Sequence, residues 1–124
     1  MRDVKNYDAR FRIIGVVEKA GEVSEIRIFP EYCEGLTAIG DYEKIMILFW
    51  MHLQDNEEGR TRLISSRPRH GKDGFRGVFA THSPHRPNPI GVTVVELVSV
   101  EGCRLSVKGF DAFEETPILD IKSA

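Results

Sequence analysis

The sequence predicts an all-β fold: a small, mostly antiparallel β-barrel with few or no helices. Two observations lead to this prediction. About seven short apolar, β-branched segments recur at intervals of about ten residues, and tight turns separate several of them. No amphipathic stretch has the length of a stable helix. The chain of 124 residues has the length of one domain, so we expect a single barrel over residues 1–124.

The first predicted strands form a local hairpin. Residues 12–18 (RIIGVVE) and 24–29 (SEIRIF) are β-branched segments, and the turn Ala20-Gly21-Glu22 lies between them. Residues 34–40 leave room for at most one helical turn. Residues 44–52 then form a strand with apolar side chains on both faces, so we expect it to be buried on both faces and central in the sheet.

The second half of the chain contains further strands. Residues 61–65 and 78–81 are predicted strand pieces on either side of a loop over residues 67–74, which is rich in glycine and charge. Residues 91–100 and 103–110 are the clearest hairpin, joined by Glu101-Gly102. Antiparallel neighbours of this kind favour a barrel or sandwich over a parallel, doubly wound sheet.

The charge is unevenly distributed, although the net charge is only −2. Residues 60–86 carry six arginines and Lys72 against Asp73 alone, a local charge of +6, which leaves −8 for the rest. Such a segment suggests a polyanion or a phosphate-bearing ligand, because the guanidinium group matches phosphate oxygens. The alternative is that these arginines pair with acidic residues elsewhere on the folded surface.

Several classes of protein are disfavoured. Cys33 and Cys103 are the only cysteines and form no CxxC motif, so we expect no disulfide framework and no thiolate zinc site, as in a reducing cytoplasm. The longest apolar run, residues 45–51, is far shorter than the roughly 20 residues that span a bilayer. The N-terminus alternates charges, so we expect no signal peptide and no membrane association.

A stiff loop over residues 79–91 is the segment most suited to hold a ligand. It contains Pro84, Pro87 and Pro89, which fix the backbone and cannot donate hydrogen bonds inside a sheet. Neither the dinucleotide-binding nor the P-loop glycine motif occurs, so any nucleoside cofactor must be held in another way. On composition alone, the loop could equally be a structural connector.

The loop carries a resemblance to a known family. ATHSPHRPNPIG (80–91), FWMH (49–52), SSRPRHG (65–71) and EETPILDIK (114–122) closely resemble, in order, the TsaA-like family, and the similarity extends from Ile13 to Lys122. Characterised members of that family are S-adenosylmethionine-dependent tRNA methyltransferases that act on N6-threonylcarbamoyladenosine beside the anticodon. The resemblance therefore implies a β-barrel, a homodimer, S-adenosyl-L-methionine held near the subunit interface, and tRNA as the partner.

The resemblance also implies site residues. The implied cofactor contacts are His52, Leu53, His82, Glu114, Glu115, Thr116 and Pro117, with Arg86, Pro87 and Asn88 in the same wall. The family usually has Asp-Gly where this chain has Glu114-Glu115. A proline-containing, PRQ-like segment that helps enclose the cofactor is replaced by a tight turn between Glu18 and Ser24.

The implied reaction requires mainly alignment, because a sulfonium methyl group is already electrophilic. The acceptor is an amide-like nitrogen, so a group that accepts its proton would help, and Asn88, His85 and Asp120 are the candidates. The sulfonium could also lie over the face of Trp50. We expect Arg67, Arg69, Lys72 and Arg76 to contact tRNA phosphates, Phe75 to lie near a splayed base, and Phe79 to be buried.

Two other functions remain open. The missing PRQ-like segment favours a non-enzymatic module that binds RNA or an adenosine ligand. A metal-dependent hydrolase would use His70, His82 and His85, but no carboxylate lies at ligand spacing between Asp73 and Glu96, and the methyltransferase interpretation predicts no metal.

Overall fold

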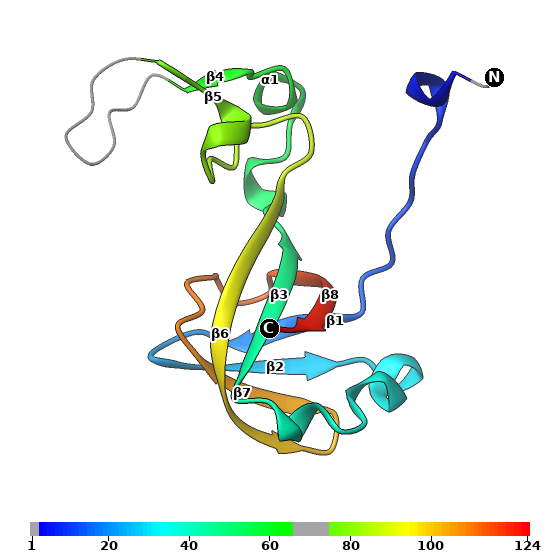
Figure 1. Cartoon of the computed structure of the whole chain (residues 1–124), viewed down its shortest axis with the longest axis vertical. Coiled ribbons are helices and arrows are strands. Elements are labelled where there is room, and N and C mark those ends of the chain that lie inside the picture. Colours follow the sequence, from blue (N-terminus) through cyan, green and yellow to red (C-terminus); the bar gives the residue numbers. More distant parts are fainter. Residues whose placement is uncertain (1–2, 66–74) are drawn as a thin grey trace.

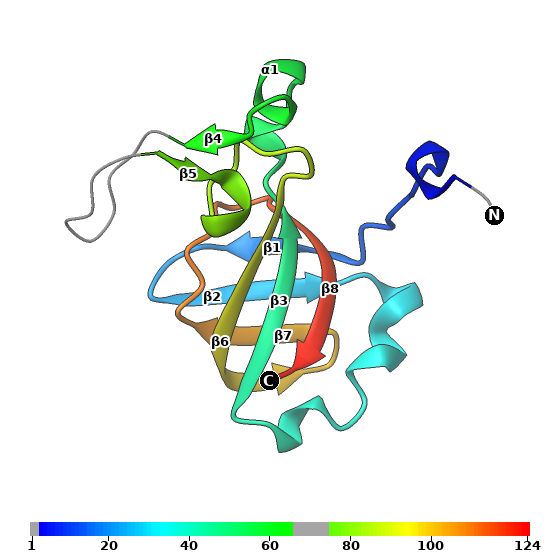
Figure 2. The same cartoon turned by 45° about the horizontal axis from the view of Figure 1, so that its top comes forward.

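The computed structural model describes residues 3–65 and 75–124, and its main body is a closed barrel of six antiparallel strands. The order around the barrel is β1-β2-β7-β6-β3-β8. The bounds are β1 Gly15–Lys19, β2 Val23–Ile28, β3 Lys44–Trp50, β6 Ile90–Glu101, β7 Arg104–Lys108 and β8 Pro117–Ser123. Figure 2 shows β1, β2 and β7 crossing behind β6, β3 and β8. The predicted fold class is confirmed.

Both predicted hairpins are present. β1 pairs with β2, and β6 pairs with β7, each in antiparallel register. The strand predicted to be central, β3, lies between β6 and β8. β8 was not among the predicted strands. This strand closes the barrel, because it pairs with β1 at Gly15↔Ile118 and with β3 at Ile47↔Ile121.

The core lies inside the barrel and follows the alternation of its strands. On β3, Ile45 and Ile47 are fully buried, whereas Met46 and Leu48 between them are only half-buried. Side chains alternate across a strand, so the second pair lies on the outer face. The prediction that β3 is buried on both faces is therefore wrong for the outer face, because only the side chains inside the barrel are fully buried. The buried cluster consists of Val17, Ile26, Ile28, Leu36, Ile45, Ile47, Val95, Leu105, Val107, Phe110 and Ile118.

Beyond one end of the barrel, β3 and β6 extend to a small upper lobe (Figure 1). The lobe contains the short helices η4 His52–Gln54, α1 Glu57–Arg60 and η5 Val78–Ala80, and the two-stranded sheet of β4 Ile64–Ser65 and β5 Arg76–Gly77. The prediction of a strand over residues 78–81 is wrong, because Val78–Ala80 is a 3-10 turn. This turn buries Val78 and leaves Phe79 80% exposed, so the predicted burial of Phe79 is also wrong.

Residues 30–41 form short 3-10 helices, η2 Pro30–Leu36 and η3 Ile39–Asp41, rather than one turn. The expectation of unpaired cysteines is wrong. Cys33 on η2 and Cys103 at the β6–β7 turn form a disulfide, with their Cα atoms 5.3 Å apart. The sequence does not indicate this contact, because the two cysteines lie 70 positions apart. In the fold, the Ile28 amide at the end of β2 donates to the Cys103 carbonyl, and this hydrogen bond brings η2 close to the β6–β7 turn.

The N-terminal arm, residues 3–13, leads away from the barrel and begins with η1 Val4–Asn6 (Figure 1). Its apolar side chains Val4, Tyr7 and Phe11 are each more than half exposed. Among the described residues, no helix has the length and apolar character needed to cross a membrane.

The approach of β6 to Phe49 gives a test of the packing at the barrel mouth. A Cβ atom at Gly91 would lie 2.4 to 2.8 Å from three ring atoms of Phe49, and that ring packs edge-on against Phe110 with centroids 5.2 Å apart. We expect Gly91→Ala to lower the free energy of unfolding by about 1–3 kcal/mol through overpacking. Urea denaturation measures the change. Gly40→Ala, where no atom lies within 4 Å, is the control and should change little; equal effects would contradict this packing.

Candidate functional site

A cavity of about 410 Å³ opens where the barrel meets the upper lobe. Its walls come from four separate segments: the end of β3 with η4, the proline-rich loop, the start of β6, and the connection between β7 and β8. The lining residues are Phe49, Trp50, Met51, His52, Leu53, Gln54, His82, Pro84, Gly91, Val92, Thr93, Asp111, Ala112, Phe113 and Thr116. An aromatic, largely apolar wall with a few polar groups is typical of a small-molecule site.

Four residues predicted to bind the cofactor line this cavity. His52 and Leu53 begin η4 directly after β3, His82 comes from the proline-rich loop, and Thr116 precedes β8. The His52 ring lies beside Trp50, with centroids 5.8 Å apart. The structure therefore brings together residues that lie up to 64 positions apart in the sequence.

The other predicted contacts on this side belong to the turn before β8. Glu114 and Glu115 are exposed, Thr116 is buried, and Pro117 begins the strand. Glu115 has a φ of +69°, in the left-handed region that favours glycine. The turn therefore keeps a backbone conformation suited to the glycine that the family usually has at this position, although this chain has Glu115. The Glu115 amide donates to the Val17 carbonyl, which anchors the turn on β1.

The proline-rich loop is held by its own side chains. The Arg86 guanidinium donates to the carbonyls of Thr81 and Ser83, at 2.9 and 3.1 Å. The loop also lies close to α1, because a Cβ atom at Gly59 would be 3.2 Å from Nδ1 of His85. Arg86 therefore braces the loop rather than pointing freely into the cavity.

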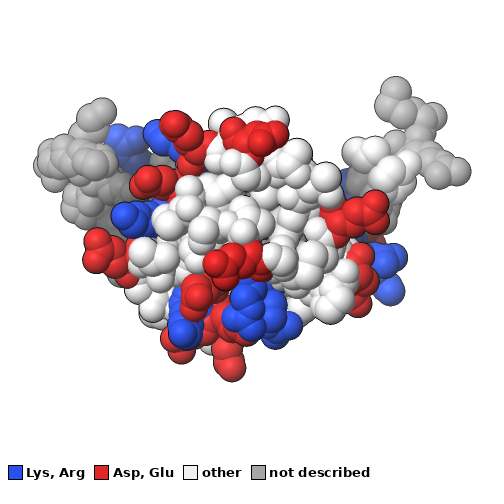
Figure 3. Space-filling model, turned by 90° about the horizontal axis from the view of Figure 1, so that it is seen from below, with Lys and Arg blue, Asp and Glu red and all other residues white. Residues whose placement is uncertain are grey.

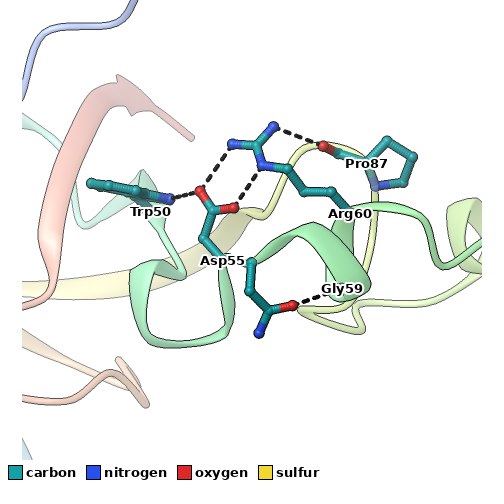
Figure 4. Close-up of polar contacts among 6 residues, drawn as sticks. Trp50, Asp55, Gly59, Arg60 and Pro87 are labelled. Atoms are coloured by element: carbon teal, nitrogen blue, oxygen red, sulfur yellow. Dashed lines mark hydrogen bonds and ion pairs between the residues drawn. The ribbon is translucent and has the colours of Figure 1, made fainter.

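A hydrogen-bonded network joins β3, α1 and the proline-rich loop (Figure 4). The Trp50 indole donates to Oδ2 of Asp55 at 3.0 Å, and Arg60 donates to both Asp55 oxygens at 2.6 and 2.9 Å. Arg60 also donates to the Pro87 carbonyl at 2.9 Å. The Asn56 side chain caps α1 by accepting from the Gly59 amide at 2.6 Å. The network fixes the plane of Trp50 and the position of Pro87 together.

The charges in this network stabilise each other. The hydrogen bonds from Arg60 are the main reason that the pKa of Asp55 is held below its usual range, and the Trp50 indole contributes while partial burial opposes the effect. The same contact raises the pKa of Arg60. Asp55 therefore stays ionised at neutral and mildly acidic pH.

The three candidates for proton acceptance do not lie together. Asn88 lines a second cavity of about 200 Å³, and His85 is half-buried beside Gly59. Asp120 is exposed on β8, accepts from the Ile121 amide and pairs with Lys122 at 3.6 Å. It lines a third cavity together with η2 and η3 residues.

The basic segment is described only in part. Arg67, Arg69 and Lys72 lie outside the described residues, and so does His70. Arg76 is on β5, and Phe75 next to it is 76% exposed. Within the described ranges, no group of three His, Cys, Asp or Glu side chains is arranged to hold a metal ion.

Several residues of the cavity wall and of the hydrogen-bonded network were not predicted from the sequence. Asp111, Ala112 and Phe113 lie in an irregular connection with no periodic pattern, and Asp55 and Arg60 lie in a charged stretch that resembles ordinary surface. The spacing of Asp55 and Arg60 gave no signal, because their pairing depends on the turn formed by η4 and α1.

The barrel and its cavity define a class of protein: a small all-β ligand-binding domain, distinct from the parallel-sheet folds that hold nucleotides on glycine-rich loops. The family follows from the sequence. Residues 15–123 match the model described as the tRNA-methyltransferase O N-terminal domain, and the chain belongs to this family. The resemblance predicted from the motifs is confirmed.

Named relatives have related functions. A probable S-adenosyl-L-methionine-binding protein of Methanocaldococcus jannaschii is 40% identical over 110 residues, covering 88% of this chain and 86% of the relative. An S-adenosyl-L-methionine-binding protein of Archaeoglobus fulgidus is 46% identical over 100 residues, covering 81% and 68%. A human tRNA (adenine(37)-N6)-methyltransferase is 36% identical over 96 residues, covering 77% of this chain and 21% of the human protein.

A crystal structure of TrmO from Pseudomonas aeruginosa has the same fold, with a TM-score of 0.71 and 25% identity. The match covers 95% of this chain and 56% of the TrmO chain, so this chain spans little more than half of that protein.

The lowered pKa of Asp55 predicts a pH-dependent contribution to stability. The unfolded chain takes up a proton on Asp55 at about pH 4, whereas the folded chain does so at lower pH. The contribution is therefore full above about pH 4 and is lost as the pH falls through the lower, folded-state pKa. We expect Asp55→Asn to cost about 1 kcal/mol at pH 7, since Arg60 is half-exposed and its ion pair is screened.

Urea denaturation of both proteins between pH 7 and pH 2.5 checks this prediction, and the difference should shrink as the solution becomes acidic. Asp8→Asn, in the exposed N-terminal arm, is the control. A difference that stays constant with pH would contradict the assigned role of Asp55.

Proposed function

We propose that this chain is an S-adenosyl-L-methionine-dependent methyltransferase that methylates N6 of threonylcarbamoyladenosine next to the anticodon of tRNA, in the cytoplasm. The main supporting observation is the cavity at the barrel mouth, where four residues predicted to bind the cofactor meet in a chain of the tRNA-methyltransferase O family. The names of the archaeal and human relatives support the cofactor and the substrate.

The residues of the cavity suit this cofactor. Trp50 and Phe113 line the cavity with aromatic rings, which attract a sulfonium cation, and the Asp111 carboxylate is an acceptor or a counter-charge. His52 and Thr116 add hydrogen-bonding groups from two different segments of the wall. When bound, the cofactor supplies an electrophilic methyl group. The chain's own contribution is to orient the two reactants and to exclude water with the proline-rich loop.

One of the three candidates is best suited to accept the proton from the acceptor nitrogen. A neutral amide such as that of Asn88 accepts a hydrogen bond but does not hold a proton, and Asp120 lines a different cavity. His85 is an imidazole, which can accept and hold a proton, and it lies on the loop that supplies His82 and Pro84 to the cofactor cavity. We therefore propose His85 for this step.

The tRNA would approach from the upper lobe. Arg76 and the predicted contacts Arg67, Arg69 and Lys72 belong to the segment with a local charge of +6. Seen from the opposite end of the molecule, acidic and basic side chains are interspersed over the surface (Figure 3). A polyanion is thus favoured at the lobe.

We also propose that the protein is a homodimer. The outer faces of β3 and β6 carry adjacent apolar pairs, Met46 opposite Val94 and Leu48 opposite Val92, and both valines are substantially exposed. A contiguous apolar strip on a sheet favours association with a second apolar surface. Val92 also lines the candidate cofactor cavity, so a second copy on this strip would border that site.

A non-enzymatic module that binds RNA or an adenosine ligand is the alternative. The tight β1–β2 turn favours it, because it replaces the PRQ-like segment and supplies no residue to the lining of the candidate cofactor cavity. Such a module would bind RNA in a salt-dependent manner without turnover.

Methyl transfer is the direct test of the main proposal. Purified protein incubated with labelled S-adenosyl-L-methionine and unmethylated, threonylcarbamoylated tRNA should transfer label to the RNA. RNA binding without transfer across a range of tRNAs would favour the non-enzymatic alternative.

Two variants test the assignment of the cavity through their affinity for the cofactor. His52→Ala should weaken cofactor binding about tenfold in calorimetry, since it removes one wall contact, while Asp120→Asn should leave binding unchanged. Equal effects of the two substitutions would show that the cofactor binds elsewhere.

The dimer is tested by sedimentation velocity. Val94→Glu should convert a dimer to a monomer, because it places a charge in the apolar strip. Val23→Glu, at the start of β2 and 40% exposed, is the matched control and should remain dimeric. A native protein that sediments as a monomer at micromolar concentration would refute the dimer.

A further inference from the structure

We propose that the second cavity holds an unpaired nucleobase of the substrate RNA, a neighbour of the modified adenosine, and so helps to select the tRNA. This inference rests on the proposed function. The cavity has a volume of about 200 Å³ and lies where β3, α1, the proline-rich loop and the N-terminal arm meet. Its lining residues are Phe11, Ile13, Trp50, Arg60, Asn88, Pro89, Ile90 and Leu119.

The lining suits a flat heterocycle with a polar edge. Six of the eight residues are apolar, including the two aromatic side chains of Phe11 and Trp50, and aromatic faces stack on any nucleobase. The remaining two, Arg60 and Asn88, are polar. Proteins that recognise single-stranded RNA combine these features, because they stack the base on an aromatic side chain and form hydrogen bonds to its edge.

Trp50 is already locked in place for stacking. Its indole N–H donates to Asp55, and the two Asp55 oxygens accept hydrogen bonds from Nε and Nη2 of Arg60 (Figure 4). A ring whose orientation is fixed loses little conformational freedom on binding. The network therefore prepares one wall of the second cavity before any ligand arrives.

Asn88 supplies the group that would read the base. It lies between Pro87 and Pro89, which restrict its backbone, and its side chain is exposed with no hydrogen bond to any described residue. A free amide presents one acceptor and one donor side by side, the pattern that pairs with an adenine edge. Arg60, in contrast, is occupied by Asp55 and Pro87.

The surrounding charge favours RNA as the source of the base. Arg10 and Arg12 flank Phe11 in the exposed arm, and neither forms an ion pair with an acid in the described ranges. These cations can bind the phosphates on either side of an inserted base. A free nucleoside would make no use of them.

The relation between the two cavities decides which base is held. Trp50 lines both of them, so the second cavity adjoins the candidate cofactor cavity at this residue. The two linings share no other residue, so a base in the second cavity lies apart from the methyl group held in the first. The second cavity is thus assigned to an adjacent nucleotide, and its role is recognition.

Binding of short RNA hairpins tests this assignment. The probe is an anticodon stem-loop that carries threonylcarbamoyladenosine, with an abasic residue placed on the 5′ or on the 3′ side of the modified base. Binding is measured without cofactor, so that the result does not depend on methyl transfer. Trp50 is the only tryptophan in the chain and lines both cavities, so the part of its fluorescence quenching that is lost with an abasic hairpin reports stacking of the missing base.

We expect one of the two abasic hairpins to bind the native protein about 5- to 150-fold more weakly than the intact hairpin, which is the loss of one stacked and hydrogen-bonded base. Asn88→Ala and Phe11→Ala should each weaken binding of the intact hairpin by a similar factor. Binding of the abasic hairpin to Asn88→Ala should be no weaker than binding with either change alone, because both changes remove the same contact. Asn6→Ala and Tyr42→Ala, at exposed positions outside both cavities, are the controls for Asn88→Ala and Phe11→Ala and should leave hairpin binding unchanged.

Additive losses, an absence of tryptophan quenching, or native binding by Asn88→Ala would overturn the assignment. If no methyl transfer occurs but the coupled losses persist, the recognition site stands and the proposed enzyme activity fails. If transfer occurs without coupling, the activity stands and the recognition site fails.

Discussion

The pairing of β3 with β6 is the constraint on which both cavities depend. The two strands stay in register from Lys44↔Glu96 to Trp50↔Ile90, and the Met51 amide continues the ladder by donating to the Pro89 carbonyl. This ladder places the end of β3 beside the proline-rich loop. Trp50 and His52 therefore meet residues 82–89 without any contact that is local in sequence.

The two faces of β3 have different roles in this arrangement. The inward side chains Ile45 and Ile47 anchor the strand in the core, and their burial contributes roughly 1.5–3 kcal/mol each. Phe49 then meets Gly91 so closely that β6 has no room for a side chain there. The outward side chains are left free for association, so one strand serves the core, the mouth and the proposed dimer face.

At the mouth, rigidity comes from polar contacts instead of burial. Asp55 joins Trp50 to Arg60, Arg60 reaches Pro87, and Arg86 braces the loop from within. A stiff rim costs less to order around a ligand than a flexible one does. In the turn before β8, the hydrogen bond from the Glu115 amide to the Val17 carbonyl holds a left-handed backbone conformation that this residue type disfavours.

The sequence by itself determined the barrel class, the two hairpins, the buried strand and the motif segments, because these follow from period-two alternation, turn residues and short local patterns. It also placed His52, His82 and Thr116 at one site, through the family resemblance. The tertiary structure alone decided the closure by β8, the Cys33–Cys103 disulfide, the 3-10 turn that exposes Phe79, and the pairing of Asp55 with Trp50 and Arg60. Each of these depends on which segments lie side by side in space, and a local pattern of residues carries no information about that distance.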